Sequence, residues 1–172
     1  LSMQARWANA NGETASVVSP VSLVVSAFAR VADVRKQLTP VLERNAETEL
    51  WLIGLGAGQR RLGGSILAQT HGAFGGAPPD LDDPDLLRGL FELIRTAHEE
   101  GLALAYHDRS DGGAFVTLCE MAFASHCGVE LQLDRWGDNP FSTLFTEELG
   151  AIIQVATEDR AAFADLIDRH GL

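Results

Sequence analysis

The sequence predicts a domain of mixed α and β structure in which helices pack on a sheet. Short apolar runs typical of strands alternate along the chain with segments whose apolar residues recur every three or four positions. Of the 172 residues, 46% are hydrophobic and 22% are charged, which lies in the ordinary globular range and supplies enough apolar material for one real core. The class is therefore α/β, without repeats or low-complexity segments.

The first part of the chain predicts a polar loop over residues 9–13, a strand over 22–28 and a short helix over 31–37. The strand is indicated by its β-branched and aromatic composition. Pro40 should stop the helix, because proline has no N–H donor and disfavours helical geometry in the residue before it. The polar stretch that follows, up to Glu49, is the best candidate for an internal boundary.

The remainder predicts alternating strands and helices. Asp83 is expected to cap a helix that has Pro84 at its first position, and Gly101 to end that helix in a left-handed conformation. The alternation of residues 129–133 predicts a strand with one solvated face, and Gly128 should close the helix before it. The expected strands cover residues 49–55, 102–107, 129–133 and 151–155, and the expected helices cover 65–71, 84–100, 114–126 and 157–170.

Charge and cysteine content restrict the possible partners and the compartment. There are 13 Lys and Arg against 24 Asp and Glu, a formal charge of −11, which repels a phosphate backbone and argues against nucleic acid. No apolar run is long enough to cross a bilayer, which argues against a membrane protein. The two cysteines, Cys119 and Cys127, have neither zinc-site spacing nor the density of a disulfide scaffold, which predicts a reducing cytoplasm.

The most informative segment for chemistry runs from His107 to Gly113, between a predicted strand and a predicted helix. Asp108 and Asp111 offer hard oxygen ligands suited to Mg²⁺, Ser110 offers a hydroxyl, and two glycines let the backbone approach a ligand where the helix begins. The residues alone leave three interpretations open: a Mg²⁺-phosphate turn, a solvated turn in which Asp111 caps the helix, or the His-Asp pair of a metal-dependent phosphohydrolase.

Two other segments give weaker signals. The glycine-rich loop over residues 54–64 has no Lys-Ser or Lys-Thr after its glycines and lacks the dinucleotide spacing, so it is neither a P-loop nor a Rossmann fingerprint. Glu147 and Glu148 could bind a metal, but a solvated charge pair before a strand is the preferred interpretation.

Four ordered segments resemble the long single-chain form of phosphoribosylformylglycinamidine synthase. The central segment runs from Ala105 to Ala124 and contains AYHDRSDGG and TLCEMAFA. The others are residues 19–30 (SPVSLVVSAFAR), 62–65 (LGGS) and 145–151 (FTEELGA), so the resemblance covers nearly the whole chain.

The resemblance implies an ATP-dependent ligase of de novo purine biosynthesis. This family converts formylglycinamide ribonucleotide to the amidine with ATP and glutamine. The chain resembles the end of the second of two aminoimidazole-ribonucleotide-synthase-like halves. Residues 1–43 would finish an N-terminal domain, and residues 44–172 would form a C-terminal three-layer α/β/α domain with a mixed sheet.

The family's nucleotide-site residues match two positions: Asp108, implied as a Mg²⁺ ligand, and Ser110, implied as a contact to ATP or ADP. No catalytic residue has a counterpart here. The implied partners are the remaining domains of the same polypeptide, including a glutaminase domain, and the fragment alone is expected to be inactive. The alternatives are a related superfamily member, such as aminoimidazole ribonucleotide synthase or selenophosphate synthetase, and a structural nucleotide-binding module without catalysis.

Overall fold

The chain forms two compact units, which comprise residues Leu1–Arg35 and Lys36–Leu172. The computed structural model describes residues 4–18, 24–31, 33–44, 46–73, 75–133 and 139–172. The domain boundary expected after residue 43 stays a prediction.

The first unit contains an antiparallel hairpin that the sequence analysis did not predict. Strand β1 (Gln4–Ala8) pairs with β2 (Thr14–Val18), with Gln4 opposite Val18 and Ala8 opposite Thr14. The predicted polar loop of residues 9–13 is the connection between them, where the Asn9 side chain accepts hydrogen bonds from the backbone N–H groups of Asn11 and Glu13. An asparagine that bonds the backbone two residues later is typical of such turns.

The strand expected over residues 22–28 is wrong where the structure describes it. Residues 22 and 23 lie outside the described part of the chain, and residues 24–28 form no strand. Strands need a partner ladder, and the side chains of Val24 and Phe28 are 89% and 95% exposed. The helix expected over 31–37 is reduced to the 3₁₀ turn η1 (Val34–Lys36), where the Asp33 side chain accepts from the Arg35 backbone and guanidinium.

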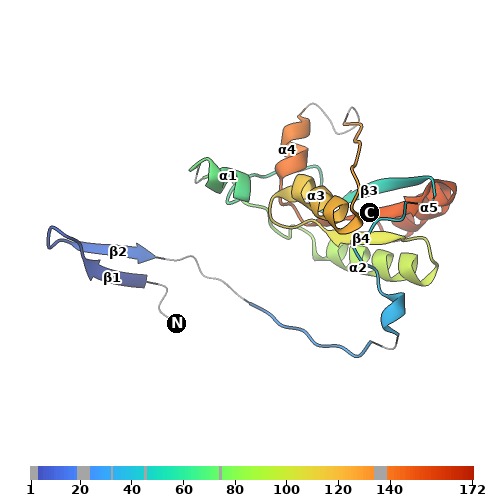
Figure 1. Ribbon diagram of the computed structural model, residues 1–172, viewed down its shortest axis with the longest axis horizontal. Helices are drawn as coiled ribbons and strands as arrows, with labels where there is room; N and C mark the ends of the chain where they lie inside the picture. The colour runs from blue at the N-terminus through green and yellow to red at the C-terminus, as the bar shows by residue number, and fades with distance from the viewer. Residues whose placement is uncertain (1–3, 19–23, 32, 45, 74, 134–138) are drawn as a thin grey trace. The chain divides into compact units, whose positions relative to one another are not determined.

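The second unit is built on a three-stranded antiparallel sheet with the order β3-β5-β4 (Figure 1). Its strands are β3 (Thr48–Gly54), β4 (Ala105–Asp108) and β5 (Gly150–Ala156). The central strand β5 pairs on both sides, so that Ile153 lies opposite Trp51 of β3 and Tyr106 of β4. An apolar run buried from both sides, as β5 is, fits this central place.

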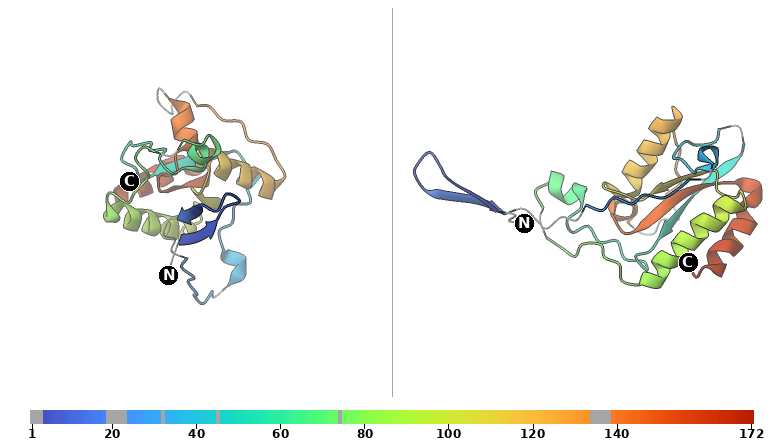
Figure 2. Two further views of the ribbon diagram at one scale, coloured as in Figure 1. Left: turned by 90° about the vertical axis from the view of Figure 1, so that its left-hand side faces the viewer. Right: turned by 90° about the horizontal axis from the view of Figure 1, so that it is seen from below.

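Successive residues of β5 point to opposite sides of the sheet, so both faces carry side chains to be buried. Helices cover both faces. On one face Ile153 packs with Leu93 of α2 (Pro84–Glu99) and Phe163 of α5 (Arg160–Arg169). On the other, Ile152 packs with Met121 of α3 (Gly113–Ser125). Figure 2 (right) shows α2 and α5 side by side on one side of the sheet and α3 on the other. The three-layer α/β/α prediction is confirmed. The expected mixed sheet is wrong for the described strands, because β3 and β4 both pair antiparallel with β5.

The predicted start of α2 is also confirmed. The Asp83 carboxylate accepts from the N–H of Asp85, with Pro84 at the first position of α2. The Ser65 hydroxyl accepts from Ala68 N–H at the start of α1 (Ile66–Thr70), and Asn139 caps α4 (Pro140–Phe145) through Ser142 N–H. The 3₁₀ turn η2 (Thr157–Asp159) leads into α5. None of the helices in the described ranges combines the length and apolar character needed to cross a membrane.

Residues 129–133 are not a strand, contrary to prediction. Their burial alternates as expected, with Val129 and Leu131 packed against the α3-side core and Glu130 and Gln132 exposed, but they pair with no described strand. Helix α3 also ends earlier than predicted, because His126 itself adopts the left-handed conformation (φ 51°) before Gly128 is reached.

Candidate functional site

The turn between β4 and α3 has a backbone that only glycine suits. Gly112 and Gly113 have φ values of 86° and 70°, and a Cβ on Gly113 would lie 2.6 Å from the carbonyl oxygens of Leu144 and Thr146. The Gly113 N–H donates to the Ser110 carbonyl at 3.0 Å and closes the turn. Gly112 is the N-cap of α3 and no side chain caps it, so the interpretation in which Asp111 caps this helix is wrong.

The two predicted site residues flank this turn. Asp108 is the last residue of β4 and its side chain is 71% exposed, so its carboxylate is open to a ligand. Ser110 is half-buried at the start of the turn. His107 Nε2 lies 3.1 Å from Glu120 Oε2 on α3, and His107 Nδ1 lies 3.5 Å from Asp108 Oδ1. The described residues contain no group of three or more His, Cys, Asp or Glu side chains arranged for a metal, which leaves the phosphohydrolase interpretation without further ligands there.

Arg109 points inward and anchors the turn to the segment before β5. Its Nε donates to the Glu148 carbonyl oxygen and its Nη2 to the Leu149 carbonyl oxygen at 2.9 Å. Burial lowers the pKa of Arg109 to about 10, against the opposing effect of the Glu148 charge, so the guanidinium stays protonated at neutral pH. Arg109 is therefore a structural cation between the two predicted site residues, Asp108 and Ser110.

Glu147 joins the turn to the start of α1. Its Oε1 accepts the Gly112 N–H at 2.8 Å and the Ile66 N–H at 2.8 Å. Ile66 directly follows the segment Leu62–Ser65, so this one oxygen brings together parts of the chain that are more than forty residues apart in sequence.

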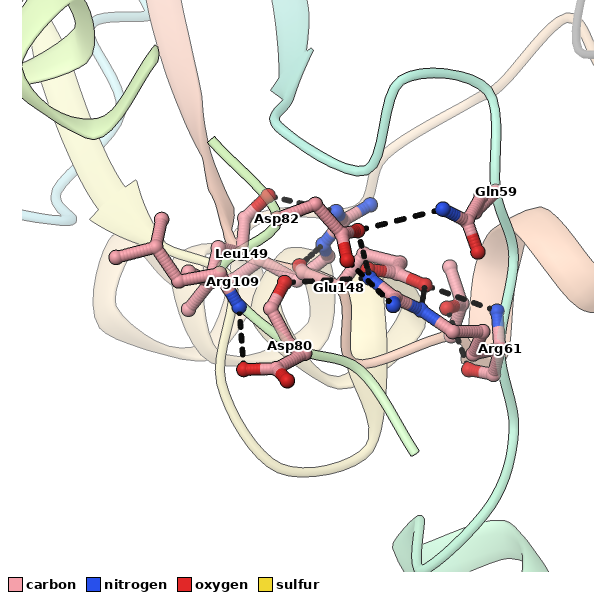
Figure 3. Close-up of polar contacts among 9 residues, drawn as sticks. Gln59, Arg61, Asp80, Asp82, Arg109, Glu148 and Leu149 are labelled. Atoms are coloured by element: carbon pink, nitrogen blue, oxygen red, sulfur yellow. Dashed lines mark hydrogen bonds and ion pairs between the residues drawn. The ribbon is translucent and has the colours of Figure 1, made fainter. Parts of the chain in front are cut away.

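Glu148 points to Arg61 of the glycine-rich loop (Figure 3). Its side chain is 1% exposed, and its carboxylate accepts from Arg61 Nε at 2.6 Å, Arg61 Nη2 at 2.7 Å and Arg61 N–H at 3.0 Å. Arg61 Nη2 also lies 2.7 Å from Asp82 Oδ2. Burial acts to raise the pKa of Glu148, but the hydrogen bonds and charge of Arg61 outweigh it and hold that pKa below its ordinary value. The bonds from Glu148 and then Asp82 raise the pKa of Arg61.

The interpretation of Glu147 and Glu148 as a solvated charge pair is therefore wrong. Both carboxylates are bound by protein donors, and Glu148 is buried. The sequence contained one signal for this: two acidic residues stand between an apolar segment and a buried strand, where solvated charges are poorly accommodated. Their partners, Arg61 and Ile66, lie about eighty residues earlier, and no local pattern points to them.

The glycine-rich loop is compact on the side of Arg61. Gln59 N–H donates to the Gly56 carbonyl at 2.8 Å, and both intervening residues, Ala57 and Gly58, have positive φ, which is the geometry of a type I′ turn. Gly63 approaches the Gly76–Ala77 backbone so closely that a Cβ would lie 2.5 Å from the Gly76 carbonyl oxygen.

The fold and the site together define an α/β/α domain that presents a glycine turn between a strand and a helix, with Glu147 bonded to the turn and the neighbouring Glu148 bonded to Arg61. Residues 47–172 match the family described as AIR synthase related protein, C-terminal domain, and the chain belongs to this family.

Two solved structures from Thermotoga maritima share the fold. The structure of PurLQS has a TM-score of 0.58 and 16% identity over 91% of this chain. The structure of PurL complexed with ATP has a TM-score of 0.55 and 15% identity over 80% of this chain. The chain spans only 23% and 22% of the respective lengths of those two proteins.

Proposed function

We propose that the chain is part of a phosphoribosylformylglycinamidine synthase of the long single-chain form. The complete protein would be an ATP-dependent, glutamine-hydrolysing ligase that converts formylglycinamide ribonucleotide to formylglycinamidine ribonucleotide in purine biosynthesis. This chain would supply part of a Mg²⁺-nucleotide site.

One observation carries the proposal: three of the segments on which the resemblance rests meet at one place. Glu147 of FTEELG accepts hydrogen bonds from Gly112 of the AYHDRSDGG turn and from Ile66, the residue after LGGS. These hydrogen bonds bring the three segments together beside Ser110, two residues after Asp108 at the end of β4. The family match and the ATP complex of a protein with the same fold support a nucleotide as the ligand.

Asp108 suits one ligand position of a bound Mg²⁺. Its carboxylate is a hard oxygen donor at the exposed end of β4, and Mg²⁺ is commonly bound by one or two carboxylates together with phosphate oxygens and water. Mg²⁺ would neutralise phosphate charge that the acidic chain would otherwise repel. The described residues supply no complete ligand set, so the proposal places the other ligands on the nucleotide, on water and on the rest of the polypeptide.

Ser110 would contact the nucleotide through its hydroxyl, beside a turn whose glycines bring the backbone close to the ligand. The proposal assigns synthetase catalysis and glutamine hydrolysis to other domains, including a glutaminase domain, so that this chain alone would make no product. A cytoplasmic location belongs to the same proposal.

The test uses the full-length protein with Asp108→Ala. We expect the variant to retain less nucleotide after gel filtration and to melt at a lower temperature in the presence of ADP and Mg²⁺, because a ligand that binds only the folded state stabilises it. Asp165→Ala removes the same charge from the exposed face of α5 and serves as the control. Unchanged nucleotide content and melting temperature in Asp108→Ala would refute the site.

A further inference from the structure

We propose that Glu147 is a positioning residue for nucleotide binding, which holds the Ser110–Gly113 turn against the start of α1 and so fixes the place of Ser110. This inference rests on the proposed function and adds to it a residue for which the sequence indicated no such role.

One carboxylate oxygen of Glu147 bonds two separate segments of the chain, an arrangement that we call the Glu147 clamp. Glu147 Oε1 accepts from Gly112 N–H and from Ile66 N–H, both at 2.8 Å. Gly112 is two residues from Ser110, and the next N–H, that of Gly113, donates back to the Ser110 carbonyl. A shift of Glu147 would therefore free both the Gly112 amide and the beginning of α1, and the turn that contains Ser110 would lose its bond to Glu147.

The direction of the Glu147 side chain is imposed by the residues on either side. The Thr146 hydroxyl donates to the Arg61 carbonyl at 2.8 Å, and the Glu148 carboxylate binds the Arg61 side chain. Thr146 and Glu148 are both about 1% exposed. In extended backbone, alternate side chains point to opposite sides, so two neighbours fixed on Arg61 leave Glu147 pointing towards the turn.

This role requires an acceptor oxygen and does not require a charge. A glutamine has the same length and keeps a carbonyl oxygen that can accept both N–H groups, whereas alanine removes the acceptor. The clamp therefore predicts that Glu147→Gln preserves function and that Glu147→Ala does not. A carboxylate that instead occupied the place of a ligand phosphate would behave differently, because its removal would improve nucleotide binding.

The experiment measures two properties of full-length protein carrying Glu147→Ala or Glu147→Gln, with Glu130→Ala and Glu130→Gln as controls at an exposed glutamate. The first is the dissociation constant for ADP in the presence of Mg²⁺. The second is the hydrogen exchange rate of peptides that contain the Gly112 and Ile66 amides.

We expect Glu147→Ala to weaken ADP binding by about tenfold, which corresponds to one or two lost hydrogen bonds, and to speed exchange at both amides. Glu147→Gln should restore most of the affinity and the protection, which separates the loss of the acceptor oxygen from the loss of the charge. The Glu130 variants should match the unsubstituted protein in both measurements.

Equal impairment of Glu147→Ala and Glu147→Gln, tighter ADP binding by Glu147→Ala, or unchanged exchange at both amides would each overturn the inference. If the unsubstituted protein bound no ADP, the proposed function would fail. The exchange measurement would then still decide whether Glu147 holds the turn, so the two failures can be told apart.

Discussion

At the scale of single residues, the most consequential group is the buried carboxylate of Glu148. A charge with 1% exposure is costly unless it is paired and hydrogen-bonded, and Arg61 supplies both. A buried pair of this kind is weak grounds for high stability, but the removal of one partner leaves the other uncompensated. Its geometric effect is clear, since it ties the glycine-rich loop to the segment that carries Glu147.

The depressed pKa of Glu148 predicts acid sensitivity. Because this pKa lies below its ordinary value of 4.5, the unfolded chain takes up the proton first. The stabilisation is therefore complete above the ordinary value and is lost as the pH falls through the pKa of the folded state. Glu148→Gln should lower the free energy of unfolding at neutral pH by about 2 kcal/mol. The free energy of unfolding of this variant should also fall less steeply as the pH is lowered.

Chemical denaturation at a series of pH values from neutral to strongly acidic measures this effect. Glu92→Gln is the control, because Glu92 forms an exposed ion pair with Arg95, and such surface pairs contribute little. If Glu148→Gln and the unsubstituted chain lost stability in parallel on acidification, the Glu148–Arg61 ion pair would not be the cause of the acid sensitivity.

At the scale of elements, the sequence predicted helices better than strands, for a physical reason. A helix start is encoded within a few residues: Asp83 and Pro84 suffice for α2, and Ser65 for α1. A strand depends on a partner elsewhere in the chain. Residues 129–133 have the alternation of a strand but pair with no described strand, and the residues of β1 and β2 gave no strong local signal although they pair with each other.

The candidate site shows the same contrast. The segment that contains Asp108 and Ser110 could be singled out because it stands between a recognisable strand and helix, and the family resemblance implied which two of its residues would bind a ligand. Glu147 and Glu148 could not, because their roles depend on donors that the fold brings from Ile66 and Arg61. Contacts between residues that are distant in the sequence have no local signature.

The start of α3 provides a prediction at this scale. Gly113→Ala should lower the free energy of unfolding by more than about 1 kcal/mol, since a left-handed φ alone costs that much for a residue with a Cβ. The close approach to the Leu144 and Thr146 carbonyls adds to this cost. Denaturant unfolding followed by circular dichroism measures the difference.

Gly128→Ala is the matched substitution. A Cβ at Gly128 would meet nothing within 4 Å, and the φ of Gly128 is not in the left-handed region. The stability of the Gly128→Ala variant should therefore stay near that of the unsubstituted chain. Equal effects of the two substitutions would show that the turn before α3 adapts to a side chain.

At the scale of the whole molecule, both hydrophobic clusters consist of residues from the second unit. Part of the connection that precedes β3 belongs to this packing. Leu42 is buried and its N–H donates to the Ser125 hydroxyl at 2.7 Å. The Gln154 side chain accepts from the Glu43 N–H and donates to the Glu43 carbonyl, much as a neighbouring strand would.

Two truncations test where the stable domain begins. A chain of residues 36–172 should retain the free energy of unfolding of the 172-residue chain within error. A chain of residues 44–172 should be less stable by about 2 kcal/mol, because it loses the burial of Leu42. Thermal and denaturant unfolding compare the three. Equal stability of the two truncated chains would instead support the boundary predicted after residue 43.

The overall class was accessible from the sequence because alternating strands and helices have few ways to bury their apolar faces. The sheet order β3-β5-β4 was not, since the last strand in the chain lies in the middle and is inserted between two earlier ones. Nothing in the residues of β5, which are apolar except for Gln154, indicates which strands become its neighbours.

The opposed directions of Glu147 and Glu148 also limit how this protein can change over evolution. Most loops accept insertions and deletions, but one residue gained or lost between Thr146 and Glu148 would exchange inward and outward side chains and break the contacts to Arg61 and Gly112 together. Homologues that conserve this arrangement should therefore vary in side chains around this segment while keeping its length constant.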